Sequence, residues 1–191
     1  MIASPQAVTL LTLDAAQMRA AHGELVELLG DAVADGASMG FMMPLDHAGM
    51  RRYWSDVADD VESGARACIV AVEHGRILGS VQLALCDKAN QPHRADVQKL
   101  LVHRSARKRG IGEALMRAVE DVAREHGRVL LLLDTRSGSD ADRLYQRWGW
   151  QPFGVVPGFA YDPDGTLAGC TFYFKQLRPS SPYGQRARGS S

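Results

Sequence analysis

The sequence predicts a single α/β domain, and three observations support this prediction. The chain has 191 residues, which is enough for one domain with a sizeable core but short for two. An apolar segment at 95–102 precedes an amphipathic helix pattern that runs from Ile111 to Val122, and a second apolar run follows at 129–134. Further strand-like segments lie on both sides of this unit. A parallel strand–helix–strand unit has a right-handed crossover, and its ligands bind at the carboxyl ends of the strands.

The first part of the chain predicts one strand and two helices. Residues 8–13 form the strand, and Asp14 is a suitable N-cap for a helix whose apolar side carries Met18, Ala21, Leu25, Leu28 and Leu29. A second helix has an apolar stripe from Met50 to Val61 and ends at Gly64.

A hairpin follows the second helix. Residues 66–72 and 76–85 are predicted strands, and Gly75 supplies the positive φ of the tight turn between them. Gly79 lies inside the second strand, where a glycine indicates a bulge or a close approach of another backbone.

The last third of the chain predicts a helix and two strands. The near-continuous aliphatic run at 129–134 is typical of a strand buried on both faces. An acidic turn then opens a helix that Gly149 ends, and its inward residues are Ala141, Leu144, Tyr145 and Trp148. The final strands are expected at 150–156 and 171–175, around a loop that contains the turn Asp162-Pro-Asp-Gly165. We expect one domain over residues 1–177 and a disordered tail over 178–191, which has too little apolar content to fold.

Composition excludes several classes of protein. The formal net charge is zero, whereas general binders of nucleic acid or membrane surfaces need an excess of Lys and Arg. The three cysteines are far apart and odd in number, which indicates buried thiols rather than a metal site or a disulfide framework. The beginning of the chain lacks signal-peptide features, and no apolar run is long enough to span a bilayer. We therefore expect a cytoplasmic protein that needs no metal and binds neither nucleic acid nor membrane.

The segment between the central strand and its helix is basic and rich in glycine. Three cations, Arg107, Lys108 and Arg109, precede Gly110 and Gly112 at the start of the helix. The first N–H groups of a helix have no intrahelical partners and lie at the positive end of its dipole, so an anion is stabilised there. Glycines let a phosphate approach the backbone. The spacing is neither a Walker loop nor G-x-G-x-x-G, and a helix start with solvated arginines is the alternative.

An apolar strand that ends in Val102, followed by Arg107-x-x-Gly110-x-Gly112, resembles the acyl-CoA pyrophosphate motif of the GNAT superfamily of N-acetyltransferases. The segment Ala141-x-x-Leu-Tyr-x-x-x-Gly149 is similar to a second motif of that superfamily. Shorter stretches resemble the tabtoxin-resistance acetyltransferases, which modify the amine of a β-lactam toxin: Asp96 to Val102, Leu133 to Thr135, Asp162 to Gly165 and Tyr173 to Lys175.

The resemblance implies a mixed sheet of six to seven strands, splayed at its central parallel pair, with helices on both faces. It implies acetyl-CoA as co-substrate and a small-molecule amine as acceptor, with toxins and antibiotics as candidates, in a monomer or homodimer. The contacts to acetyl-CoA that it implies fall on Leu100, Leu101, Val102, Arg107, Lys108, Arg109, Gly110, Ile111, Gly112, Glu113 and Tyr145. Gly138 stands where the family often has Asn, so Ser137, Ser139 or Asp140 would have to replace that contact.

Acetyl transfer to an amine needs a base and an acid. A primary amine with a pKa of about 10.4 arrives protonated, and Asp134 at the end of its strand is the first candidate to remove the proton. Asp96 is the second candidate, and the Asp134 carboxylate could instead bind the substrate ammonium. Tyr145 is the candidate acid that protonates the leaving thiolate, with a buried core tyrosine as the alternative reading. His103 is expected to be a surface residue.

Two further questions stay open at this point. The glycine-broken segment 36–44 suits a cover over a pocket, and Met39, Phe41, Met42 and Met43 would either line an acceptor site or fill the core. A non-catalytic acetyl-CoA sensor would keep the anion site without turnover. The presence of both Asp134 and Tyr145 favours the enzyme.

Overall fold

Seven strands form one mixed sheet in the computed structural model, which describes residues 8–178. The strand order is β1-β2-β3-β4-β5-β7-β6, and only β4 and β5 are parallel neighbours. This confirms the predicted sheet and its central parallel pair. The strands are β1 (Thr9–Leu13), β2 (Arg66–Glu73), β3 (Arg76–Leu85), β4 (Arg94–Val102), β5 (Leu130–Arg136), β6 (Gln151–Tyr161) and β7 (Leu167–Gln176).

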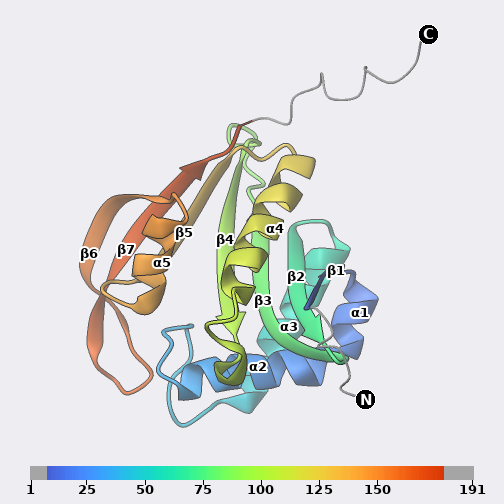
Figure 1. The fold of residues 1–191 in the computed structure, drawn as a ribbon, viewed down its shortest axis with the longest axis vertical. Coiled ribbons are helices and arrows are strands. Elements are labelled where there is room, and N and C mark those ends of the chain that lie inside the picture. The colour runs from blue at the N-terminus through green and yellow to red at the C-terminus, as the bar shows by residue number, and fades with distance from the viewer. Residues whose placement is uncertain (1–7, 179–191) are drawn as a thin grey trace, which may run out of the picture.

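Helices cover both faces of the sheet (Figure 1). Alternate residues of β2 point to opposite sides, so Ile69 packs in the core beneath α4 while Val70 packs against α1–α3. The helices are α1 (Ala15–Ala20), α2 (His22–Ala34), α3 (His47–Glu62), α4 (Ile111–Glu125) and α5 (Asp140–Arg147), with a short 3₁₀ turn η1 (Arg104–Ala106) after β4.

The single helix predicted after Asp14 is in fact two helices. Asp14 caps α1 through a capping box with Gln17, as its position suggested. The helix breaks at Ala21, two residues before Gly23. Glycine has the lowest helix propensity after proline, so a break close to it is energetically inexpensive.

The last two strands are longer than predicted. The expected loop at 157–169 is mostly strand, and only residues 162–166 connect β6 to β7. The expected loop began at Pro157, but a register shift between Val156 and Ala160 accommodates Pro157 and Gly158 within the ladder. Proline and glycine are tolerated in strands at such irregularities.

The prediction that β5 is buried on both faces is wrong. Leu131 and Leu133 are buried, whereas Leu132 is half-buried and Asp134 is exposed. Helices α1–α3 pack on β1 to β4 and do not extend over β5 (Figure 1). One face of the β5-β7-β6 half therefore remains open beside Asp134.

Strands β4 and β5 pair over only three residue pairs, from Arg94 opposite Leu130 to Asp96 opposite Leu132. Beyond Asp96 the two strands diverge, and Figure 1 shows the space between them widening toward the end of β4. On its other edge β4 carries a bulge against β3, where Lys99 has a φ of +50°. An extra residue of this kind bends a strand and increases its local twist.

Gly79 confirms the expected close approach. It lies beside a register shift between β2 and β3 and pairs with Val102 at the end of β4. A Cβ atom at this position would lie 2.8 Å from the Leu101 carbonyl oxygen and 3.0 Å from a Leu115 methyl carbon. The absence of a side chain lets β3 fit between β4 and α4.

Residues 1–7, which were expected to carry no signal-peptide features, and most of the predicted tail at 178–191 lie outside the described residues. Within residues 8–178, no helix has the length and apolarity needed to cross a membrane.

We expect Gly79→Ala to lower the free energy of unfolding by about 1–3 kcal/mol, because the new methyl group overlaps a backbone oxygen. Urea denaturation measures this change. Gly23→Ala is the matched control, since a Cβ atom on Gly23 would have no neighbour within 4 Å and alanine favours a helix by up to about 1 kcal/mol. Equal effects of the two substitutions would contradict the steric argument.

Candidate active site

The gap between β4 and β5 brings the predicted catalytic residues to its two sides. Asp134 lies on β5 two residues beyond the last β4 pair. Tyr145 of α5 is buried on the opposite face of the sheet, yet it is close enough for the Asp134 charge to act on it. A ligand seated in the gap would therefore lie between a carboxylate and a phenol.

The start of α4, where the sequence predicts an anion site, lies beside this gap. Gly110 is the N-cap with a φ of +79°, and no side chain caps the helix. Glu113 in the first turn pairs with Arg117 instead, at 2.5 Å. A Cβ on Gly112 would lie 3.5 Å from Trp148 and 3.8 Å from Val102, so this glycine borders the end of β4 and the end of α5. Among the described residues, no side chain accepts from the first backbone N–H groups of α4, which lie at the positive end of the helix dipole.

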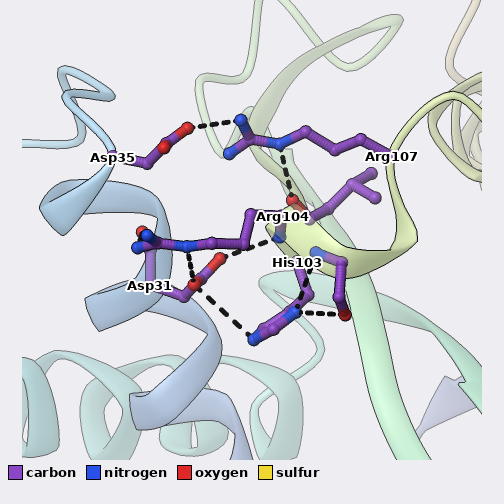
Figure 2. A network of polar contacts seen from close by, with 7 residues as sticks. Asp31, Asp35, His103, Arg104 and Arg107 are labelled. Carbon is purple, nitrogen blue, oxygen red and sulfur yellow. Dashed lines mark hydrogen bonds and ion pairs between the residues drawn. The ribbon is translucent and has the colours of Figure 1, made fainter.

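Carboxylates of α2 hold the arginines of the loop before α4 (Figure 2). Asp31 accepts hydrogen bonds from the backbone N–H of Arg104 at 2.9 Å and from its Nε at 2.5 Å. Arg107 pairs with Asp35 and also donates from its Nε to the Val102 carbonyl at 3.3 Å. The predicted pyrophosphate arginine is therefore already bound to a carboxylate.

The other two predicted cations, Lys108 and Arg109, differ in whether a carboxylate binds them. Arg109 is paired with Glu73 at the end of β2, at 2.5 and 3.2 Å. Lys108 is exposed with a φ of +60°, and within residues 8–178 it forms no ion pair. Of the three cations, Lys108 is the one that an anion could meet without displacing a carboxylate.

Asp134 is the more accessible of the two candidate bases. Its Oδ2 accepts a hydrogen bond from the Cys170 thiol at 3.3 Å, and it forms no ion pair among the described side chains. Asp96 lies where strand pairing still holds and is bound to Arg94 at 3.3 Å. Only Asp134 therefore presents a carboxylate without a cationic partner to the gap.

Tyr145 is held in an aromatic cluster. Its ring centroid lies about 6 Å from those of Trp148, Trp150 and Tyr173. Burial raises the pKa of Tyr145 well above its ordinary value, and the Asp134 charge raises it further. The phenol consequently stays protonated, which is the form that an acid requires.

His103 has a structural role, in agreement with its expected place at the surface. Its Nδ1 accepts from the Ser105 backbone N–H at 3.3 Å and so caps η1, while Nε2 lies 3.5 Å from Asp31. It therefore belongs to the support of the loop.

Segment 36–46 connects α2 to α3 and touches both sides of the gap. The Met43 N–H donates to the Pro163 carbonyl at 3.0 Å, which ties the segment to the β6–β7 connection. Met39 and Phe41 are half-buried against the helical core, whereas Met42 and Met43 are 43% and 50% exposed. The core interpretation is therefore wrong for Met42 and Met43.

A cavity of about 350 Å³ lies next to the gap, between the end of α2, segment 36–46 and the β6–β7 connection. Arg136 contributes to its wall and is fixed by Asp162 at 2.6 Å. Asp134 and Tyr145 do not line it. No group of three or more metal-ligating side chains occurs in the part of the chain that the structure describes.

Three features of the site were not predicted from the sequence. Lys99 lies beside the gap, Cys170 donates to Asp134, and the carboxylates of α2 hold the arginine loop. Burial, followed by the hydrogen bond to Asp134, raises the pKa of Cys170 to about 12. Cys170 directly precedes the predicted strand at 171–175, and only this position could have suggested its contact with the end of β5.

The Asp31–Arg104 contact predicts a pH-dependent stability. Burial acts to raise the pKa of Asp31, but the hydrogen bonds from Arg104 outweigh it and hold the pKa below its ordinary value. A carboxylate whose pKa is lowered by folding stabilises the protein above its unfolded pKa, near 3.9, and this contribution is lost as pH falls through the folded value.

We therefore expect Asp31→Asn to lower the free energy of unfolding at pH 7 by about 1–3 kcal/mol, with the difference from wild type shrinking below about pH 4. Chemical denaturation across pH 3–7 measures it. Asp121→Asn is the control, because Asp121 is 72% exposed in its pair with Arg124 and such surface pairs contribute less than about 1 kcal/mol. A deficit that is constant with pH would exclude the proposed charge effect.

Comparison with known proteins identifies the family. The model of the acetyltransferase (GNAT) family matches residues 32–150, which is more than half of the chain. An N-acetyltransferase of Azospirillum brasilense, named for its place in the hisH–hisA intergenic region, is 35% identical over 115 residues, covering 59% of this chain and 67% of the relative.

Solved structures share the fold. An N-acetyltransferase from Staphylococcus aureus superposes with a TM-score of 0.74 at 16% identity, over 91% of this chain and 100% of that one. A Salmonella typhimurium structure that contains the cofactor acetyl-CoA superposes with a TM-score of 0.73 at 18% identity, over 92% and 97% of the two chains. With its splayed β4–β5 pair, its uncapped α4 and these matches, the chain belongs to the GNAT acetyltransferase family.

Proposed function

We propose that the protein transfers an acetyl group from acetyl-CoA to a primary amine of a small molecule, with toxin and antibiotic amines among the candidates. The observation that carries this proposal is the gap between β4 and β5. It opens beside the uncapped start of α4 and has Asp134 and Tyr145 at its two sides. Acetyl-CoA, when bound, supplies the acetyl group as a thioester.

The residues at the start of α4 fit a pyrophosphate. The backbone N–H groups after Gly110 have no side-chain acceptor, and Lys108 lies in the same loop without a carboxylate partner among the described residues. Arg107 would exchange Asp35 for phosphate oxygens. Residues 100–102 of β4 would line the pantetheine arm, because β4 is free of β5 there. Arg109 is held by Glu73 and is a weaker candidate than the sequence suggested.

Asp134 is the proposed base. The amine arrives as an ammonium, and nitrogen attacks the thioester only after a proton has left. Asp134 is exposed in the open part of the gap, and the Cys170 thiol fixes one of its oxygens while the other remains available. Asp96 is less suited, because Arg94 neutralises it.

Tyr145 is the proposed acid. The thiolate that leaves needs a proton, and the buried phenol of Tyr145 is protonated at neutral pH. A phenol with a raised pKa gives up its proton only to a strong base, and a desolvated thiolate in a closed site is such a base.

Tyr145→Phe tests this role. It retains the ring cluster and removes the proton, so we expect kcat to fall about 10²-fold or more while the affinity for acetyl-CoA stays within about twofold. A thiol-release assay gives kcat, and calorimetry gives the affinity. Unchanged turnover would remove Tyr145 from the mechanism.

Two substitutions should move CoA affinity in opposite directions. Asp35→Asn frees Arg107 and removes a negative charge beside the phosphate site, so we expect binding to tighten about 3- to 10-fold. Gly112→Leu places a large side chain against Trp148 and the first turn of α4, and should weaken binding at least 10-fold.

Calorimetry with CoA measures both changes, with Asp121→Asn as a distant control for charge. Full CoA affinity in the Gly112→Leu variant would exclude the pyrophosphate site at α4. Unchanged affinity in the Asp35→Asn variant would show that Arg107 does not bind the cofactor.

A further inference from the structure

Lys99 places an ammonium group beside the gap, on the face of the sheet that also carries Asp134. Its Nζ donates to the Met39 carbonyl at 3.0 Å and lies 5.3 Å from the centre of the Tyr53 ring. An ammonium has three N–H donors, so two of them have no hydrogen-bond partner among residues 8–178. Within residues 8–178 no carboxylate forms an ion pair with Lys99.

The backbone of β4 accounts for this position. Lys99 and Leu100 together lie opposite Val81 in the bulge against β3, and Lys99 has a φ of +50°, a conformation that non-glycine residues adopt rarely. Strain of this kind persists where the surrounding structure enforces it and is concentrated at functional sites. Leu101, two residues further on, is buried against the helices on the same face.

A buried donor near Lys99 lacks an acceptor among residues 8–178. Gln82 is fully buried, and its Oε1 accepts from both Tyr53 and Arg66. Arginine can only donate, so this contact fixes which end of the Gln82 amide is the oxygen. The Gln82 Nε2 is then a buried donor that has no partner in the part of the chain that the structure describes.

The charge environment is also unbalanced at Lys99. Burial lowers its pKa, the charge of Asp134 opposes that change, and the nearby Arg66 reinforces it. The ammonium is therefore partly desolvated, and Asp134 across the gap is the charge that compensates it. An added anion next to Lys99 would be stabilised.

We infer that the acceptor is a zwitterion of the amino-acid type, with its ammonium at Asp134 and its carboxylate at Lys99. This inference rests on the proposed transfer to an amine and specifies the class of that amine. The two charged ends of such a molecule match the carboxylate of β5 and the ammonium of β4. A charge-assisted hydrogen bond from Lys99 would replace or join the one to Met39.

An apolar side chain has a place in the same arrangement. Phe172 lies directly opposite Asp134 on β7, so the two side chains share a face. Its ring contacts Phe159 at 5.3 Å and Phe153 at 6.1 Å between centroids. Phe153 and Phe159 are 57% and 50% exposed. An apolar substituent on the acceptor would cover part of this aromatic surface, whereas a polyamine would bring a second cation toward Lys99 and Arg66.

Equilibrium binding tests the inference separately from turnover. Binding of L-phenylalanine, L-leucine and L-methionine is compared with binding of the corresponding amino-acid amides, which lack the carboxylate. The affinities are measured by calorimetry with CoA present. We expect the wild-type protein to bind at least one acid about 10- to 100-fold more tightly than its amide. Lys99→Met should reduce this ratio to near one, and Lys99→Arg should restore part of it. Lys88→Met, at an exposed position in the β3–β4 loop, should leave it unchanged.

The outcomes separate the two proposals. Equal binding of acids and amides by the wild-type protein, or a ratio that Lys99→Met leaves unchanged, would overturn the zwitterion inference even if amines are acetylated. Selective acid binding that depends on Lys99, without release of CoA thiol from acetyl-CoA, would uphold the acceptor site and overturn the proposed transfer. The ammonium of the amide loses its proton more readily than that of the acid, so the amide is intrinsically the more reactive acceptor. Faster acetylation of the acid would therefore result from its binding at the site.

Discussion

The short contact between β4 and β5 is the constraint on which the rest of the structure depends. Three residue pairs hold the two halves of the sheet together, and beyond them the strands diverge. Backbone groups that would pair in a continuous sheet are left facing a gap, and buried polar groups of this kind need partners. The α4 helix starts next to the end of β4, and Tyr145 of α5 is buried within reach of the Asp134 charge. The break in pairing therefore creates both the space for a ligand and the polar groups to bind it.

The loop between β4 and α4 depends on a second support outside the sheet. Asp31 and Asp35 are four residues apart on α2, so they project from the same side of the helix toward Arg104 and Arg107 (Figure 2). These contacts fix the shape of the loop, in which three arginine side chains would otherwise repel one another. Surface ion pairs contribute little individually, but Asp31 also accepts from a backbone N–H, and its side chain is only 12% exposed.

Features of the site that lie within one short segment were predicted from the sequence, whereas contacts between distant segments were not. The glycines before α4 and the helical spacing that buries Tyr145 are properties of short segments, and both are where the sequence indicated. Asp35 and Arg107 are 72 residues apart, and neither belongs to a pattern that signals their pairing. The sequence predicted a regular strand through Lys99. The bulge there was missed because no glycine marks it in the sequence. The extent of β6 was missed because a ladder irregularity and a turn use the same residues, proline and glycine.

Asp35 has a further consequence, because it ends α2 and immediately precedes segment 36–46. Its contact with Arg107 places the anchoring of that segment and the binding of a phosphate in competition for one guanidinium. Thermodynamic linkage makes such a competition reciprocal. A ligand that breaks the Asp35–Arg107 contact would tighten phosphate binding to Arg107, and a bound phosphate would tighten the binding of that ligand by the same factor. Two substrates would then be coupled through a single ion pair at the end of α2.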